Sequence, residues 1–205
     1  MGDGKFAQNE EDFIISEYFA SKPHGTFMDI GANDGVTFSN TRLMALKGWK
    51  GCLVEPSPKA YEKLVALYKG FKGFYTYNVA LSNHNGNAIL HESGPLCSAQ
   101  DVALVSTFHA HEMDRFKKSV TYEPITVKCF TWKTFLNRLS IKQFDLISID
   151  VEGEELSILP DINLDQTSMI VIEWNSKPEL KVEYEKYLAG FRLVYTSAEN
   201  LIYAR

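Results

Sequence analysis

The sequence lacks paired cysteines and long apolar runs, and both absences exclude classes of protein. Its three cysteines, Cys52, Cys97 and Cys129, are widely spaced and fit neither a disulfide framework nor a zinc site. We therefore expect reduced thiols in a cytoplasmic protein. No apolar stretch is long enough to cross a bilayer, so we expect no membrane insertion.

An excess of basic residues is also missing. The chain has 21 lysines and arginines against 26 aspartates and glutamates, a formal net charge of -5, and both signs are mixed along it. A protein that binds nucleic-acid phosphates needs a clustered basic face. We therefore expect no nucleic-acid partner, and a small molecule or a glycan as the partner that the protein binds.

The 205 residues, 45% of them hydrophobic, are enough for one α/β domain with a sizeable core. Strand-like and helix-like segments alternate, which is typical of a parallel sheet with crossover helices. Apolar runs at 26–30, 51–54, 144–149 and 169–172 predict strands of that sheet. No linker divides the chain, so we expect a single domain over residues 1–205.

Helices are predicted at 10–20 and 39–47, and Ser57 is the expected cap of another helix, with Pro58 in its first turn. A helix that ends at Leu139 follows a strand at 126–130.

The remaining strands are predicted at 74–81, at 87–91 and in a closing hairpin of 191–195 and 201–203. The segment 93–120 is polar and has no clean period. We expect it to be either an ordered insert or a mobile lid.

The strongest chemical signal is the run from Phe27 to Gly35, in which an apolar strand enters a Gly-x-Asn-x-Gly turn. Glycines there let a ligand approach the backbone, although a tight turn without a ligand has the same pattern. A dinucleotide site needs glycine where Asn33 stands, and Asp29 would repel a diphosphate. S-adenosylmethionine carries an ammonium and a sulfonium but no phosphate, so the turn favours this methyl donor over NAD.

Carboxylates follow two more of the predicted strands. Glu55 lies about 20 residues beyond the turn, where a carboxylate accepts both ribose hydroxyls. A solvated acid at a helix start is the alternative, but the pairing with Asp29 favours the ribose role. Asp150 and Glu152 follow the 144–149 strand. We expect them to face the methionine end of the donor or the acceptor, because the carboxyl ends of central parallel strands line the ligand crevice.

Several motifs resemble the FkbM-type methyltransferase family in order and spacing, and together they cover nearly the whole chain. They are Asp29 to Gly35, Val54 to Pro56, Asn78 to Ser82, Ile149 to Leu156, and the two ends at 8–12 and 200–205. Several motifs in the same order and spacing match a family by chance much less often than a single glycine turn does.

The resemblance implies a Rossmann-like class I methyltransferase fold, with helices on both faces of a mostly parallel seven-stranded sheet whose last strand is antiparallel. It also implies S-adenosylmethionine-dependent O-methylation of a hydroxyl, often on a sugar or a natural product. The turn would then meet the methionine part of the donor, Glu55 the ribose, and residues 80–82 the adenine edge. The cofactor-binding residues implied by position are Asp29, Gly31, Ala32, Asn33, Gly35, Glu55, Pro56, Ala80, Leu81, Ser82 and Asp150.

A hydroxyl is a poor nucleophile until its proton leaves, so we expect a general base or a metal. His109 and His111, in the insert, are candidate bases, and Asp150 and Glu152 are further candidate catalytic residues. Ordinary surface histidines are the alternative for the first pair.

A metal site has a weaker basis. Asp150, Glu173 and Asn175 stand at the ends of adjacent predicted strands, and oxygen ligands of this kind suit Mg²⁺. We nevertheless expect metal independence, because the donor's own positive charge offsets the carboxylates.

Two other classes of function are compatible with a fold of this kind. A nicotinamide-dependent oxidoreductase is disfavoured by Asn33 and Asp29. A non-catalytic glycan- or nucleotide-binding scaffold would show a degraded donor site, whereas Asp29, Gly31, Glu55 and Asp150 are all present.

Overall fold

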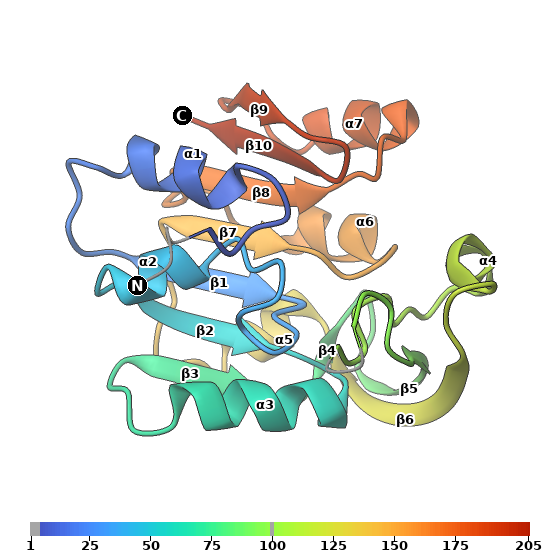
Figure 1. Ribbon diagram of the computed structural model, residues 1–205. Coiled ribbons are helices and arrows are strands. Elements are labelled where there is room, and N and C mark those ends of the chain that lie inside the picture. The colour runs from blue at the N-terminus through green and yellow to red at the C-terminus, as the bar shows by residue number, and fades with distance from the viewer. Residues whose placement is uncertain (1–4, 99–100) are drawn as a thin grey trace.

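A computed structural model describes residues 5–98 and 101–205 (Figure 1). Within these residues seven strands form one sheet, in the order β3-β2-β1-β7-β8-β10-β9. The strands are β1 (Thr26–Ile30), β2 (Lys50–Val54), β3 (Phe74–Tyr77), β7 (Leu146–Ile149), β8 (Met169–Glu173), β9 (Arg192–Thr196) and β10 (Asn200–Ala204).

Strand direction agrees with the sequence-based expectation. β3, β2, β1, β7 and β8 pair in parallel, whereas β10 pairs antiparallel with both β8 and β9. The predicted mostly parallel sheet with an antiparallel last strand is therefore confirmed. Because β1, β2, β7 and β8 are parallel, their carboxyl ends meet at one edge of the sheet.

Helices cover both faces of this sheet, as predicted. Phe27 of β1 packs with α1, α2 and α3 on one face, and Met28 packs with α5, α6 and α7 on the other. Ser57 caps α3, and its Oγ accepts a hydrogen bond from the Ala60 N–H at 3.3 Å. The helices are α1 (Glu11–Tyr18), α2 (Arg42–Leu46), α3 (Pro58–Tyr68), α4 (Ala110–Phe116), α5 (Trp132–Leu136), α6 (Glu155–Ile158), the short 3₁₀ helix η1 (Leu159–Asp161) and α7 (Pro178–Glu185).

The predicted single strand at 74–81 is wrong. The chain leaves the main sheet at Asn78, whose side-chain amide donates to the carbonyl oxygens of Glu55 at 2.9 Å and Pro56 at 3.0 Å. The next residues form β4 (Ala80–Leu81), which joins a smaller sheet with β6 (Tyr122–Phe130) and β5 (Gly86–Ser93) in the order β4-β6-β5. β5 and β6 are longer than the strands that the sequence predicts at 87–91 and 126–130.

The segment 93–120 is more regular than its composition indicates, since it contains α4. Thr107 pairs with His91 of β5 through two backbone hydrogen bonds of 2.9 and 3.2 Å. Figure 1 shows the small sheet and α4 beyond the carboxyl ends of β1, β2, β7 and β8. The insert therefore lies over the sheet edge where a ligand is expected.

In the described part of the chain, no helix combines the length and the apolar composition that crossing a membrane requires.

Candidate functional site

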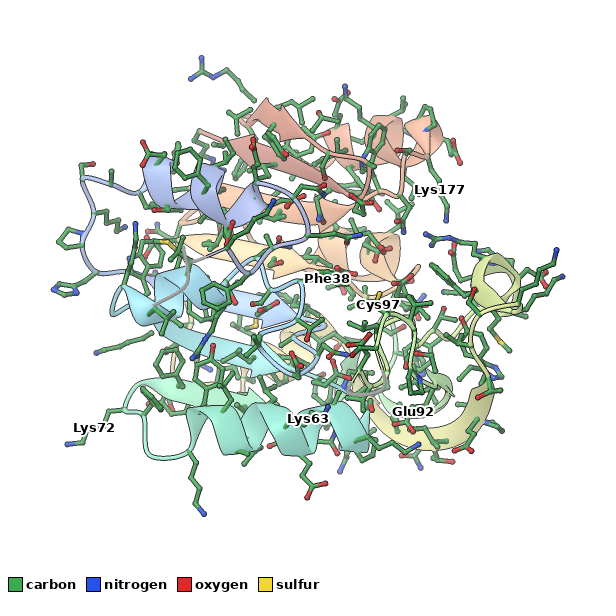
Figure 2. All side chains as sticks on the ribbon, in the orientation of Figure 1. Phe38, Lys63, Lys72, Glu92, Cys97 and Lys177 are labelled. Atoms are coloured by element: carbon green, nitrogen blue, oxygen red, sulfur yellow. The ribbon has the colours of Figure 1, made fainter. Side chains whose placement is uncertain are left out.

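A cavity of about 400 Å³ opens at the carboxyl ends of β1, β2, β7 and β8. The insert closes its other side: Figure 2 labels Phe38, from the loop after β1, and Cys97, from the insert, which both line it. Most of the predicted site residues line this cavity, namely Asp29, Gly31, Ala32, Asn33, Glu55, Pro56, Ala80, Leu81, Asp150, Glu152, Glu173 and Asn175.

The glycines of the turn after β1 are required by packing. Gly31 has φ 88°, and a Cβ there would lie 1.7 Å from the Asp150 carbonyl oxygen. Gly35 does not line the cavity; a Cβ there would lie 2.7 Å from Leu64 Cδ1 of α3. The turn is therefore glycine-rich because β7 and α3 approach it closely, which brings the end of β7 against the end of β1.

Glu55 is held at the cavity wall by two backbone donors. The N–H of Asn33 donates to Glu55 Oε2 at 2.8 Å, and the N–H of Ser57 donates to Oε1 at 2.7 Å. Burial raises the pKa of Glu55 to about 8, and these two hydrogen bonds act in the opposite direction. The Asn33 side chain also donates to the Val102 carbonyl oxygen at 2.8 Å, which ties the turn to the insert.

Asp29 lines the cavity from β1. Its Oδ2 accepts a hydrogen bond of 2.6 Å from Thr41 Oγ1, and the residue is buried. Burial raises the pKa of Asp29 to about 6, and the Thr41 hydrogen bond partly offsets this.

Three carboxylates form an acidic wall at the ends of β7 and β8. Asp150, Glu152 and Glu173 each place a carboxylate oxygen within 4.8 Å of the others, and Arg115 Nη1 lies 3.5 Å from Glu152 Oε2. Burial, and then the charge of Asp29, raises the pKa of Asp150 to about 7, whereas Arg115 lowers it. The pKa values of Glu152 and Glu173 are raised in the same direction by burial. Such a wall has the chemistry to take up protons or to bind a cation.

Neither histidine that the sequence offers as a base lines the cavity. His109 Nε2 lies 2.8 Å from Glu154 Oε1, and His111, with 74% of its side chain exposed, lies 3.3 Å from Glu112. The structure instead brings Ser106, Phe108, Arg115 and Phe116 of the insert to the cavity. The sequence gives no signal for this, because the facing of residues in an insert depends on how the insert packs.

A match between the sequence and a family model identifies the family of this chain. Residues 29–194 match the family described as the methyltransferase FkbM domain. The chain belongs to this family. Among curated proteins, none is similar enough to this chain for a significant match.

Solved structures of class I methyltransferases share the fold of this FkbM-family chain. A candidate RNA methyltransferase from Pyrococcus horikoshii has 12% identity and a TM-score of 0.52 over 95% of this chain and 81% of its own. A ribosomal protein L11 methylase from Lactobacillus delbrueckii subsp. bulgaricus has 12% identity and a TM-score of 0.51 over 96% and 77%. A precorrin-6y C5,15-methyltransferase from Geobacter metallireducens has 14% identity and a TM-score of 0.51 over 98% and 90%.

In this FkbM-family chain, the part of the cavity wall near β4 is apolar. Ala80 and Leu81 line it together with Val79, Leu90 of β5 and Leu96 of the insert. Ser82, which the resemblance places at the adenine edge, does not line it; its N–H donates to the Phe130 carbonyl oxygen at 3.1 Å. Leu90 and Leu96 could not be predicted as cavity residues from the sequence, because the small sheet is what brings them to the cavity.

Proposed function

We propose that this methyltransferase takes its methyl group from S-adenosylmethionine and transfers it to a hydroxyl of a small molecule or a glycan. The observation that carries the proposal is the division of the cavity. Ala80, Leu81 and Leu90 give the cavity an apolar lining from the small sheet, and the carboxylates Asp29 and Asp150 line it from β1 and from the end of β7.

The donor fits this division. An adenine ring suits the apolar wall, and Glu55, with its carboxylate oriented by Asn33 and Ser57, suits the ribose hydroxyls. Asp29 and Asp150 would face the positively charged methionine portion, whereas they would repel a diphosphate. The volume of about 400 Å³ is within the usual range of small-molecule sites.

The donor supplies a methyl group on a sulfonium, so the protein has to orient the acceptor hydroxyl and remove its proton. We propose Asp150 as the group that accepts this proton. It lines the cavity, and its pKa of about 7 is close to the value at which a base is most effective. Arg115, beside Glu152, supplies one positive charge to the same wall.

A cytoplasmic location belongs to the same proposal and is supported by the three free thiols, Cys52, Cys97 and Cys129. A metal-independent reaction belongs to it too. The oxygens of Asp150, Glu152, Glu173 and Asn175 offer Mg²⁺ suitable ligands, so this part has its own test.

The test is transfer of a labelled methyl group from S-adenosylmethionine to a panel of hydroxylated small molecules and glycans, with RNA as a separate arm. We expect label in a hydroxylated acceptor, and the same rate in excess chelator. Label in RNA alone would refute the acceptor class. Activity that is lost in chelator and restored by Mg²⁺ would refute metal independence.

A further inference from the structure

Asn40 is a buried amide in the wall of the cavity, on the loop between β1 and α2. It is 5% exposed, and its Nδ2 donates to Ser148 Oγ of β7 at 3.3 Å. Its Oδ1 has no hydrogen-bond partner among the residues that the structure describes. A buried acceptor without a partner costs free energy, so a group bound in the cavity is the natural partner for this oxygen.

A second acceptor lies on the same face of the sheet. Asp29 stands opposite Ser148 in the register of β1 and β7, and Ser148 in turn holds the Asn40 amide. Thr41, the neighbour of Asn40, donates to Asp29 Oδ2 at 2.6 Å and so fixes the carboxylate. Asp29, Asn40 and Ser148 all line the cavity.

The chemistry of this corner selects the group that it binds. An amide oxygen and a carboxylate both accept hydrogen bonds, so the ligand group must donate them. The charge of Asp29 favours a cation there and disfavours a carboxylate or a phosphate. An ammonium has three donors and no acceptor, which matches both requirements.

We propose that Asn40 Oδ1 and Asp29 together bind the α-ammonium of the methionine portion of the donor. The inference rests on S-adenosylmethionine being the donor, and it makes Asn40 a specificity residue for the amino-acid end. Asn40 thereby separates the donor from nucleosides that share the adenosine part but have no amino group.

Calorimetry of the full chain tests this with ligands that differ at one end. S-adenosylhomocysteine carries the ammonium, its des-amino analogue lacks only that group, and 5′-methylthioadenosine lacks the whole amino-acid portion. Asn40→Leu keeps the size of the side chain and removes the acceptor. We expect Asn40→Leu to bind S-adenosylhomocysteine about 10- to 150-fold more weakly than the wild type, the range for a hydrogen bond to a charged group.

The other two ligands should bind the wild type and Asn40→Leu with the same affinity. Asn83→Leu is the matched control, since it makes the same substitution at an exposed position outside the cavity, so it should retain the preference for the amino-bearing ligand. Asn40→Asp, which keeps an acceptor in the same shape, should also retain that preference, and it serves if Asn40→Leu does not fold.

Equal losses for S-adenosylhomocysteine and its des-amino analogue in Asn40→Leu, or no loss at all, would overturn the inference and leave the donor assignment standing. Loss of the preference in Asn40→Asp would overturn it as well. A wild-type chain that binds none of the three ligands would instead refute the donor itself, and the inference with it.

Discussion

The carboxylate of Glu55 accepts hydrogen bonds from Asn33 and Ser57, and burial nevertheless raises its pKa to about 8. A ligand that donates to this carboxylate therefore gains a group already held in position. Glu55→Ala should weaken the binding of S-adenosylhomocysteine by about 1.5–3 kcal/mol, measured by calorimetry. Glu62→Ala, on the exposed side of α3, is the control and should bind normally. Equal affinities in the two variants would remove Glu55 from the donor site.

Substitutions of Asp150 and of the two histidines test which side chain acts as the general base. Asp150→Asn should lower turnover by about 10²–10⁴-fold, because a lost general base has that effect. His109→Ala and His111→Ala should each lower turnover less than tenfold, since neither side chain lines the cavity. A loss of 10²-fold or more in His109→Ala, with donor affinity unchanged, would move the base to the insert.

The pH profile checks the same assignment. A base must be deprotonated to act, and the pKa of Asp150 is raised to about 7. The kcat/KM of the wild type for the donor, which reports on the free enzyme, should therefore rise with pH through about 7 and level off above it. The remaining activity of Asp150→Asn should lack this rise. A rise that persists in the variant would show that another group titrates.

At the scale of elements, the turn after β1 is fixed by its neighbours. Gly31→Ala would place a Cβ 1.7 Å from the Asp150 carbonyl oxygen, whereas Gly48, at φ 90°, has open space around it. Gly48→Ala should cost about 1–2 kcal/mol of unfolding free energy, from backbone strain alone. Gly31→Ala should cost more than about 4 kcal/mol or prevent folding. Denaturant unfolding measures both, and equal costs would contradict the packing described for the turn.

The elements that the sequence predicts well are those defined by their own residues. β1 has the predicted bounds because its apolar run stops at Gly31, and α3 begins at its Ser57–Pro58 cap. The break in the 74–81 strand was not predictable in this way, because it depends on the Asn78 amide reaching carbonyl oxygens of residues 55 and 56.

The same distinction between predictable and unpredictable parts applies to the candidate site. Motif residues at strand ends, such as Asp29, Glu55 and Asp150, could be placed from the sequence because parallel strands bring their carboxyl ends together. The facing of His109 and Arg115 depends on how the insert packs on the strand ends, and no local pattern encodes that. Asn40 was missed because a single polar residue beyond the turn carries no motif.

For the whole molecule, buried acids at the strand ends and at the start of α6 contribute to the response of stability to pH. Burial raises the pKa to about 6 in Asp29, about 7 in Asp150 and Glu155, and about 8 in Glu55. Each folded value lies above the unfolded one, so the folded state binds more protons between about pH 4 and pH 8. Their contribution to stability is present at the acidic end and is lost as the pH rises.

The Tm of the ligand-free chain should therefore fall as the pH rises from about 5 to about 8. Saturating S-adenosylmethionine should reduce this fall, because its positive charge favours the ionised carboxylates. Thermal unfolding followed by circular dichroism measures both curves. A Tm that rises across this range would contradict the burial of charge at the site.

The central claim is that the cavity binds S-adenosylmethionine, and calorimetric titration of the purified chain tests it most directly. The account predicts one molecule of S-adenosylmethionine or S-adenosylhomocysteine bound per chain, and no heat of binding with NAD under the same conditions. Binding of NAD without binding of either methionine derivative would contradict it.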